Sequence, residues 1–483
     1  MRILNNIRKT YSQMSIVTKA TLWFIICSIL QKGIAVLTTP VFTRLMTTEQ
    51  YGQFSVYSSW LQVITIFTTL RLNGAVFNKG MSKYKDDRDS YTATMQTVTV
   101  ISTCICFAIY IVFRQQINAL TELPTFIMVA MFIELYFIPA IDYWTVKKRY
   151  EYLYVPVVVR TLVMAALNAV IGIVAVCLLP EKGYARIITC VLVDVCFGIG
   201  LFAYNYRKSN AKLVKEYAVF AVRFNAPLLI HYISQYILEQ FDRIMVQKMV
   251  GIAAAGIYSV AYGVGLLLRI VTTSINNALV PWQYEKLEKK KYKELDDVMF
   301  SFLCVVAACS VVLSCLAPEV MHILAGEAYY EGVYVIPPVA LGLFFSFMYT
   351  LYANIEFYFE KTKFSMYISM TGAILNIVLN YIGIQLFGYI AAAYATLICY
   401  LVFAIGHYIY TISCIKKSKE SQDYSFNVIR LIGLSVSVLG FSILFIYLYD
   451  SIFIRYGIIL AIFLILISQR KRIKHILFAI KRN

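Results

Sequence analysis

The sequence predicts an all-α membrane protein with about 14 transmembrane helices. Hydrophobic residues make up 60% of its 483 residues and charged residues only 14%, whereas about a quarter of a soluble domain is charged. About fourteen apolar runs approach the roughly 20 residues that a helix needs to cross a bilayer. These runs start near Ala20, Gly52, Tyr91, Leu123, Leu153, Ile187, Tyr217, Gly251, Asp297, Gly332, Phe364, Gly388, Asn427 and Ile452.

Several function classes are disfavoured by composition. The connections between runs are short and leave no room for a soluble catalytic domain, so we expect no enzyme, no catalytic residues and no bound cofactor. The 11 cysteines lie in or beside apolar runs without zinc-type spacing, which predicts neither a disulfide framework nor a metal site. The first run contains Lys32 and lacks a small-residue cleavage site, so we expect no cleaved signal peptide.

Basic residues are unevenly distributed among the loops. With the N-terminus inside, the cytoplasmic segments hold about 31 of the 44 Lys and Arg residues and the opposite loops hold about 7. The positive-inside rule and an even number of spans therefore predict that both termini are cytoplasmic. The basic excess fixes orientation in the membrane, and we expect no nucleic-acid partner.

The chain contains an internal repeat. Residues 42–46 read Phe-Thr-Arg-Leu-Met and precede Gly-Gln-Phe-Ser-Val at 52–56, while residues 241–245 read Phe-Asp-Arg-Ile-Met and precede Gly-Ile-Tyr-Ser-Val at 256–260. Chance similarity between apolar segments is the alternative, but the Arg and Gly matches are not apolar. Six spans separate the copies, which predicts two parallel six-helix bundles related by a pseudo-twofold axis along the membrane normal. The halves cover residues 1–212 and 213–415, and residues 416–483 form two additional helices and a basic cytoplasmic tail.

The chain resembles a known family at residues 32–52, at 224–260, at Asn376 and Asn380, and at 388–396. These segments are similar to the bacterial polysaccharide repeat-unit flippases (O-antigen, Wzx-type), within the superfamily that includes MATE exporters and the lipid II flippase. One departure is the start of the central signature, which reads Val222-Arg223-Phe224 and puts a charge inside the span.

The resemblance implies two bundles that form a V around a central cavity in the bacterial cytoplasmic (inner) membrane. It also implies a flippase that moves polyprenyl-diphosphate-linked oligosaccharide across this membrane by alternating access, for O-antigen or capsule synthesis. The expected partners are that substrate, membrane lipids, a polysaccharide polymerase and a chain-length regulator. The alternative is a MATE-like ion-coupled exporter of small molecules, although a positive lumen would repel cationic drugs. A glycosyltransferase would need larger external loops, and a scaffold would leave the intramembrane charges unexplained.

Basic residues inside the spans are the candidate substrate-binding groups. A charge at mid-bilayer costs about 2.5–3.5 kcal/mol, so each needs a partner, a wet cavity or a route to the headgroups. Arg side chains suit a diphosphate because guanidinium offers forked donors; snorkelling to the headgroups is the alternative. The predicted topology puts four of the five in the cytoplasmic half of their spans and Lys32 nearer the middle. The set is Arg71, Arg160, Arg223, Arg269 and Lys32.

Acidic and titratable residues inside the spans are candidates for coupling export to H+ or Na+. The set is Glu134, His231, Glu239 and Asp194. His231, Glu239 and Asp242 fall within about 80° of one another on an ideal helix, which favours cavity lining over a helix–helix hydrogen-bond seam. Asn376 and Asn380 more closely fit a packing seam.

A further polar face runs along the second span, from Ser55 to Asn73. On an ideal helix Arg71 points away from this face. Arg71 could join it only if the helix breaks near Leu72-Asn73-Gly74.

Overall fold

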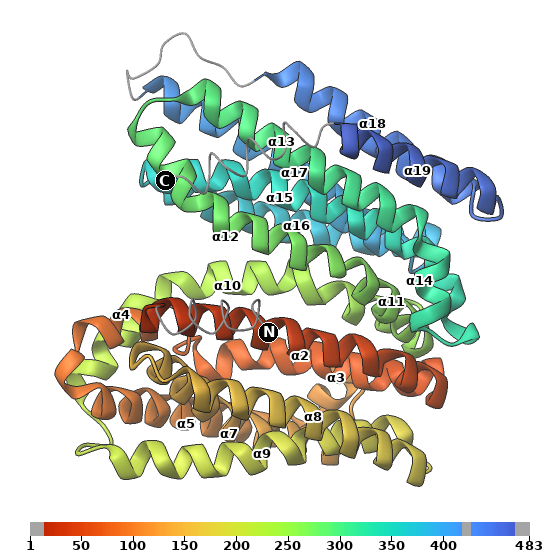
Figure 1. Ribbon diagram of the computed structural model, residues 1–483. Coiled ribbons are helices and arrows are strands. Elements are labelled where there is room, and N and C mark those ends of the chain that lie inside the picture. Colours follow the sequence, from red (N-terminus) through yellow and green to blue (C-terminus); the bar gives the residue numbers. More distant parts are fainter. Residues whose placement is uncertain (1–13, 418–426, 469–483) are drawn as a thin grey trace, which may run out of the picture. The chain divides into compact units, whose positions relative to one another are not determined.

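The computed structural model describes residues 14–417 and 427–468, and every regular element in these two ranges is helical (Figure 1). The all-α prediction is therefore confirmed. The chain divides into two compact units, Met1–Tyr236 and Ile237–Asn483, and each is described by itself. The predicted boundaries of the halves and their pseudo-twofold relation stay predictions. The predicted basic tail after Ser468 lies outside the described residues.

Unit 1 is a bundle of long helices joined by short turns. Its elements are α2 (Ile16–Leu45), α3 (Thr48–Thr69), α4 (Ala75–Lys83), η1 (Lys85–Asp87), α5 (Arg88–Val112), α6 (Arg114–Thr121), α7 (Thr125–Tyr150), α8 (Tyr154–Leu178), α9 (Lys182–Lys208) and the first part of α10 (Lys215–Met249). Helix α7 packs against α5 and α9, and α8 packs against α2 and α9. Helix α3 packs against α5 and α9.

Local sequence sets where these helices begin. Thr47 caps α3: its hydroxyl accepts from the Gln50 backbone N–H at 3.2 Å, and the Gln50 side chain accepts from the Thr47 N–H at 3.0 Å. This reciprocal capping box satisfies two backbone donors that the first turn of a helix leaves free. Ser15 caps α2 in a simpler way, by accepting from the Thr18 N–H at 3.1 Å.

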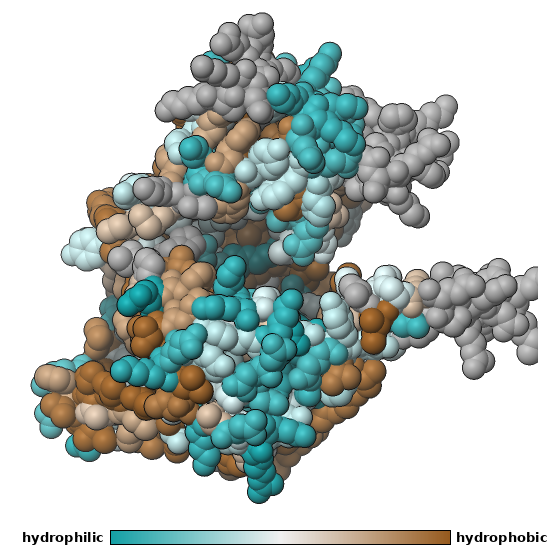
Figure 2. Space-filling view, turned by 90° about the vertical axis from the view of Figure 1, so that its left-hand side faces the viewer, coloured by the Kyte–Doolittle hydropathy of each residue, from teal (hydrophilic) through white to brown (hydrophobic). Residues whose placement is uncertain are grey.

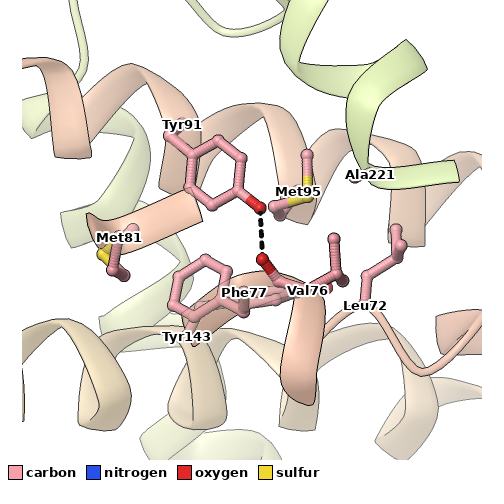
Figure 3. Packing of buried hydrophobic residues seen from close by; sticks show 8 residues of the cluster. All are labelled: Leu72, Val76, Phe77, Met81, Tyr91, Met95, Tyr143 and Ala221. Carbon is pink, nitrogen blue, oxygen red and sulfur yellow. Dashed lines mark hydrogen bonds between the residues drawn. The ribbon is translucent and has the colours of Figure 1, made fainter. Parts of the chain in front are cut away.

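A buried aromatic core lies where α4, α5, α7 and α10 meet in unit 1 (Figure 3). Tyr91 is fully buried and donates its hydroxyl to the Val76 carbonyl at 3.0 Å. Gly80 lies against the Tyr91 ring so closely that a Cβ atom there would overlap it. The short helix α4 is thus held against the bundle by a contact that only glycine permits.

The α4 end of unit 1 is strongly basic. Lys79, Lys83, Lys85, Arg207 and Lys208 are all exposed there. Figure 2 shows hydrophilic side chains gathered over this end, with hydrophobic residues on the flank. The predicted topology makes this the cytoplasmic end, and the orientation itself stays a prediction.

Unit 2 is a second helical bundle. Besides the end of α10 it contains α11 (Ile252–Gly265), α12 (Leu267–Glu288), α13 (Tyr292–Cys315), α14 (Ala317–Leu324), η2 (Glu327–Val335), α15 (Ile336–Tyr358), α16 (Thr362–Phe387), α17 (Ala391–Lys417), α18 (Val428–Tyr447) and α19 (Ile452–Ser468). Helix α15 is its central element and packs against α12, α13, α17 and α18. The apolar span Glu327–Tyr358 is mostly buried: 83% of its most apolar 18-residue stretch is inside the protein. The same share is only 17% for the span Tyr154–Leu178 of unit 1.

Helix α19 is attached to this bundle through a buried arginine. Arg455 is 2% exposed and donates to the Cys315 carbonyl and to the Glu319 carboxylate, both at 2.7 Å. The ion pair with Glu319 compensates a charge that would be costly to bury alone. This contact joins α19 to the end of α13 and to α14.

The predicted apolar runs all coincide with helices. Within the described ranges, 11 helices are long and apolar enough to cross a membrane. The other predicted runs form α3, α10 and α19; polar residues along α3 and α10 lower their hydropathy, and the described apolar part of α19 is short. The protein is a multi-pass membrane protein, and the count of about 14 spans stays a prediction.

Candidate functional site

A break in a predicted span positions Arg71. Helix α3 ends at Thr69, and Leu70 and Arg71 both adopt the left-handed conformation, with φ of 47° and 51°. The break that Arg71 would need in order to join the polar face of this span therefore exists, and it starts two residues before Leu72. The Leu70 carbonyl accepts a hydrogen bond from the Asn225 side chain of α10. Such a partner is needed because an unsatisfied carbonyl is costly in an apolar environment.

Two tyrosines of α10 orient the Arg71 guanidinium. Its Nη1 donates to the Tyr236 hydroxyl at 3.0 Å, and its central carbon lies 5.2 and 5.3 Å from the ring centroids of Tyr236 and Tyr232. Cation–π contacts of this kind favour one orientation of the guanidinium plane. Its Nε is buried and has no hydrogen-bond partner within the described part of the chain. Arg71 therefore presents a fixed charge with unused donor capacity.

Arg160 has closer protein partners. Its Nη2 donates to the Thr145 hydroxyl of α7, and its guanidinium lies 5.8 Å from the Trp144 ring centroid. The carboxylate of Asp142, also on α7, interacts electrostatically with both Arg160 and Arg71 and accepts from the Asn73 amide at 2.8 Å. Asp142 therefore offsets part of the positive charge of Arg160 and Arg71 inside unit 1.

The remaining basic candidates differ in their surroundings. Arg223 on α10 and Lys32 on α2 are exposed, and neither makes a hydrogen bond or ion pair with another described residue. Arg269, in the first turn of α12 in unit 2, forms an ion pair with Glu239 at 3.0 Å. Both of those side chains keep more than a third of their surface exposed. Arg223 is thus available for a ligand, whereas Arg269 already has a carboxylate partner.

Two of the four acidic or titratable candidates meet inside unit 1. Glu134 of α7 is 2% exposed and accepts a hydrogen bond from the Tyr57 hydroxyl of α3. Its carboxyl group interacts electrostatically with that of Asp194 of α9, which accepts from the Asn168 amide at 3.2 Å. Two neighbouring carboxylates repel each other when both are ionised, which makes this pair the candidate for proton binding in unit 1.

A cavity of unit 1 is lined by Asn168, the hydrogen-bond partner of Asp194. It has a volume of about 350 Å³ and is lined by residues of α2, α3, α8 and α9, including Asn168 and Arg186. Arg186 donates to the Asn168 carbonyl at 2.9 Å, and its guanidinium lies 4.4 Å from the Phe42 ring centroid. Because Asn168 contacts both the cavity and Asp194, it links the cavity to the carboxyl pair.

The other two acidic or titratable candidates, Glu239 and His231, are not part of the carboxyl pair. Glu239 is engaged by Arg269, so its charge is already compensated. His231 lies in α10, but its side chain is outside the described part of the structure.

Unit 2 contains a polar network that the sequence analysis did not propose as an ion site. Asp242 of α10 is 1% exposed and accepts from the Tyr258 hydroxyl at 3.0 Å, the Asn380 amide at 2.9 Å and the Thr396 hydroxyl at 2.8 Å. Asn376 accepts from Asn380 at 3.0 Å. The sequence analysis favoured cavity lining for Asp242, but the network places this residue in a helix–helix hydrogen-bond seam. The packing seam predicted for Asn376 and Asn380 agrees with the network. The Asn380 side-chain oxygen is buried and has no partner in the described chain.

A second buried acid in unit 2, Glu356, was not among the candidates that the sequence analysis proposed. Glu356 is fully buried, and its carboxylate lies 2.9 Å from the His407 Nδ1 and accepts from the Thr411 hydroxyl at 3.3 Å. The spacing of four between His407 and Thr411 on α17 was the available signal, since it puts both side chains on one face.

Comparison with known proteins identifies the family. The family model described as polysaccharide biosynthesis protein matches residues 17–286, which is more than half of the chain. The chain belongs to the polysaccharide biosynthesis protein family. The model of the MatE family also matches, over residues 227–382. The resemblance to the superfamily of MATE exporters and oligosaccharide-lipid flippases is confirmed.

Relatives of this member of the polysaccharide biosynthesis protein family occur in Haemophilus influenzae. The Lsg locus putative protein 1 is 21% identical over 384 residues, which cover 75% of this chain and 90% of the relative. An uncharacterized membrane protein is 24% identical over 353 residues, covering 70% and 83% of the two chains.

Solved structures show the same fold. The lipid II flippase MurJ in its inward closed conformation aligns with a TM-score of 0.69 and 14% identity, over 94% of this chain and all of MurJ. An inward-facing multidrug resistance MATE transporter aligns with a TM-score of 0.57 and 14% identity, over 81% and 96% of the two chains. At these identities the comparison shows a shared fold.

Proposed function

We propose that this protein is a flippase that moves polyprenyl-diphosphate-linked oligosaccharide repeat units across the bacterial cytoplasmic membrane for surface polysaccharide synthesis. Membership of the polysaccharide biosynthesis protein family supports the pathway, and the fold shared with MurJ supports a transport role. The observation that carries the proposal is the pair of arginines in unit 1. Arg223 is exposed without a protein partner among the described residues, and Arg71 is oriented while its Nε stays unbonded.

The diphosphate is the part of the substrate that these arginines would recognise. A guanidinium group binds two phosphate oxygens at once, which Lys cannot do with the same geometry. Leaving a buried donor unbonded costs about 1–3 kcal/mol, so an oxygen that reaches the Arg71 Nε would recover part of this cost. Arg269, Arg160 and Lys32 complete the proposed set. Arg269 would have to exchange its Glu239 partner for phosphate.

Coupling to an ion gradient is part of the proposal. The carboxyl pair of Glu134 and Asp194 would bind and release a proton, and the adjacent cavity would let water reach it. A sodium ion would instead suit the oxygens of the Asp242 network, because hard cations prefer oxygen ligands and the Asn380 oxygen lacks a partner. Alternating access, which the family resemblance implies, would convert ion binding into export.

The proposed setting follows from the topology prediction. Both termini would lie in the cytoplasm of a bacterium, where the lipid-linked repeat unit is assembled. A polysaccharide polymerase and a chain-length regulator would act on the exported product. Cysteine labelling of intact cells tests the orientation: a cysteine introduced at Lys290 should be protected from an impermeant reagent, and one at Ala328 should react.

Export in a strain that lacks the chromosomal copy tests the role of Arg223. Arg223→Ala should lower surface polysaccharide at least tenfold, roughly the effect of losing one charge-assisted contact, with normal protein level in the membrane. Arg223→Lys should restore only part of it. Arg430→Ala is the matched control, because Arg430 is an exposed arginine paired with Asp297 at 3.0 Å. Normal export by Arg223→Ala would leave snorkelling as the explanation of this residue.

The match of the MatE family model favours a second candidate function, the ion-coupled export of small molecules. This function predicts that expression lowers the accumulation of a fluorescent drug in a strain without other exporters. The flippase proposal predicts no change in drug accumulation and a loss of surface polysaccharide when the gene is deleted.

A further inference from the structure

Helices α5 and α7 leave an apolar groove on the flank of unit 1. The groove has a volume of about 320 Å³, and its wall includes Cys104, Phe107, Phe132 and Phe137. Neighbouring α5 side chains such as Ile105, which is 56% exposed, also point away from the bundle. In a membrane protein such a surface faces lipid chains, so the groove offers an aromatic-lined channel to one of them.

A second pocket continues the groove at one end. It has a volume of about 390 Å³ and shares Phe107 and Val129 with the groove. Its far wall is polar and contains Arg114, Gln115 and Gln116 from the start of α6. The chain turns there, where α5 ends at Val112, so the polar pocket lies at the end of an apolar helix.

Hydrogen bonds hold the polar pocket in shape. The Tyr110 hydroxyl donates to the Asn118 side-chain oxygen at 3.0 Å, and the Asn118 amide donates to the Thr125 hydroxyl at 2.8 Å. Tyr110 is 2% exposed, so this link between α5, α6 and α7 is anchored in the bundle. The pocket is therefore formed before any ligand binds.

Charge decides what the pocket can accept. Arg114 is exposed and makes no hydrogen bond or ion pair with the described residues. Neither the groove nor the polar pocket is lined by a carboxylate. An apolar groove that ends at an unpaired guanidinium and two amides is complementary to an amphiphile with a long chain and an anionic head.

We propose that this surface binds one anionic glycerophospholipid, with an acyl chain in the α5–α7 groove and its phosphate on Arg114 and the two Gln side chains. The site is separate from the arginines proposed to bind the transported diphosphate, and the inference does not depend on the proposed function. Under the predicted topology α6 is external, so the lipid would come from the outer leaflet. Its chain and head together would tie α5, α6 and α7 to the membrane surface.

Native mass spectrometry of the purified protein in detergent tests this site. Palmitoyl-oleoyl phosphatidylglycerol should be retained as one tightly bound molecule, roughly tenfold more strongly than the phosphatidylcholine with the same chains. Arg114→Gln should erase this preference, and Cys104→Phe, which fills the groove, should weaken binding of both lipids. Arg207→Gln is the matched control, since Arg207 is also exposed and lies at the α9 end of unit 1.

Three results would overturn the proposal. The first is equal retention of the two lipids by the wild-type protein. The second is an unchanged preference for phosphatidylglycerol in Arg114→Gln, and the third is an equal loss of this preference in Arg114→Gln and Arg207→Gln. A polyprenyl phosphate that binds in an Arg114-dependent way while phosphatidylglycerol does not would show that the occupant is the transported lipid class and not a membrane phospholipid.

Discussion

Asp242 connects four helices of unit 2, so its removal should have a large effect on stability. The carboxylate is 1% exposed and accepts hydrogen bonds from Tyr258 of α11, Asn380 of α16 and Thr396 of α17. Asp242→Ala strands the buried hydroxyls of Tyr258 and Thr396 and one amide hydrogen of Asn380, whose amide keeps its bond to Asn376. Each unsatisfied buried donor costs about 1–3 kcal/mol, so the free energy of unfolding should fall by at least about 3 kcal/mol. Thr396→Val removes one contact and should cost about 1–2 kcal/mol.

Thiol labelling can measure these changes in the detergent-solubilised protein. Cys315, Cys399 and Cys414 are buried in unit 2 and become reactive when it unfolds. A denaturant titration with a thiol-reactive fluorophore then reports the free energy of unfolding. Combining both substitutions gives a double-mutant cycle, in which Thr396→Val should cost little in the Asp242→Ala background because its acceptor is already gone.

Two results would refute this reasoning. If the costs of Asp242→Ala and Thr396→Val are additive within about 0.5 kcal/mol, the two side chains do not interact. If Asp242→Ala alone costs less than about 1 kcal/mol, the carboxylate does not hold the network together.

Three further predictions concern other parts of the chain. Gly80→Ala should destabilise unit 1 by about 1–3 kcal/mol, because the new methyl group overlaps the Tyr91 ring, and thermal unfolding in detergent measures the loss. Burial raises the pKa of Glu319, but the hydrogen bond and charge of Arg455 outweigh it and hold the pKa below its usual value. The ion pair should therefore stabilise the fold fully at neutral pH and progressively less as the pH falls below about 4.3, and this acid-dependent loss should be smaller in Glu319→Gln. Glu134→Gln keeps the shape of the side chain but cannot release a proton, so export by this variant should no longer respond to collapse of the proton gradient.

Hydropathy and spacing predicted the helices well because the membrane imposes a strict requirement on each span. An apolar run must satisfy its backbone internally, so long runs became helices throughout the described chain. The break after α3 entered the sequence analysis only as a condition, since Arg71 could join the polar face of the second span only if the helix broke near Leu72. The helix ends two residues before Leu72, and nothing in the residue types of Leu70 and Arg71 indicates the left-handed conformation that they adopt.

Partners of the intramembrane charges could not be predicted in the same way. Asp242 and Thr396 are separated by 154 positions, and Glu356 and His407 by 51, so no local pattern relates them. Helical periodicity gave the face on which Asp242 lies. Whether that face meets water or another helix depends on tertiary packing, and the seam formed because α16 and α17 supply side-chain amides and hydroxyls at the right depth.

Transport in proteoliposomes is the most direct test of the proposed flippase activity. The purified protein is reconstituted with a labelled polyprenyl-diphosphate oligosaccharide in the inner leaflet, and arrival in the outer leaflet is followed with an impermeant enzyme that modifies the sugar. The account predicts that wild-type protein and Arg430→Ala expose the sugar at the same rate and that Arg223→Ala does so at least tenfold more slowly. Exposure at the rate of protein-free liposomes with the wild-type protein, under both proton and sodium gradients, would contradict it.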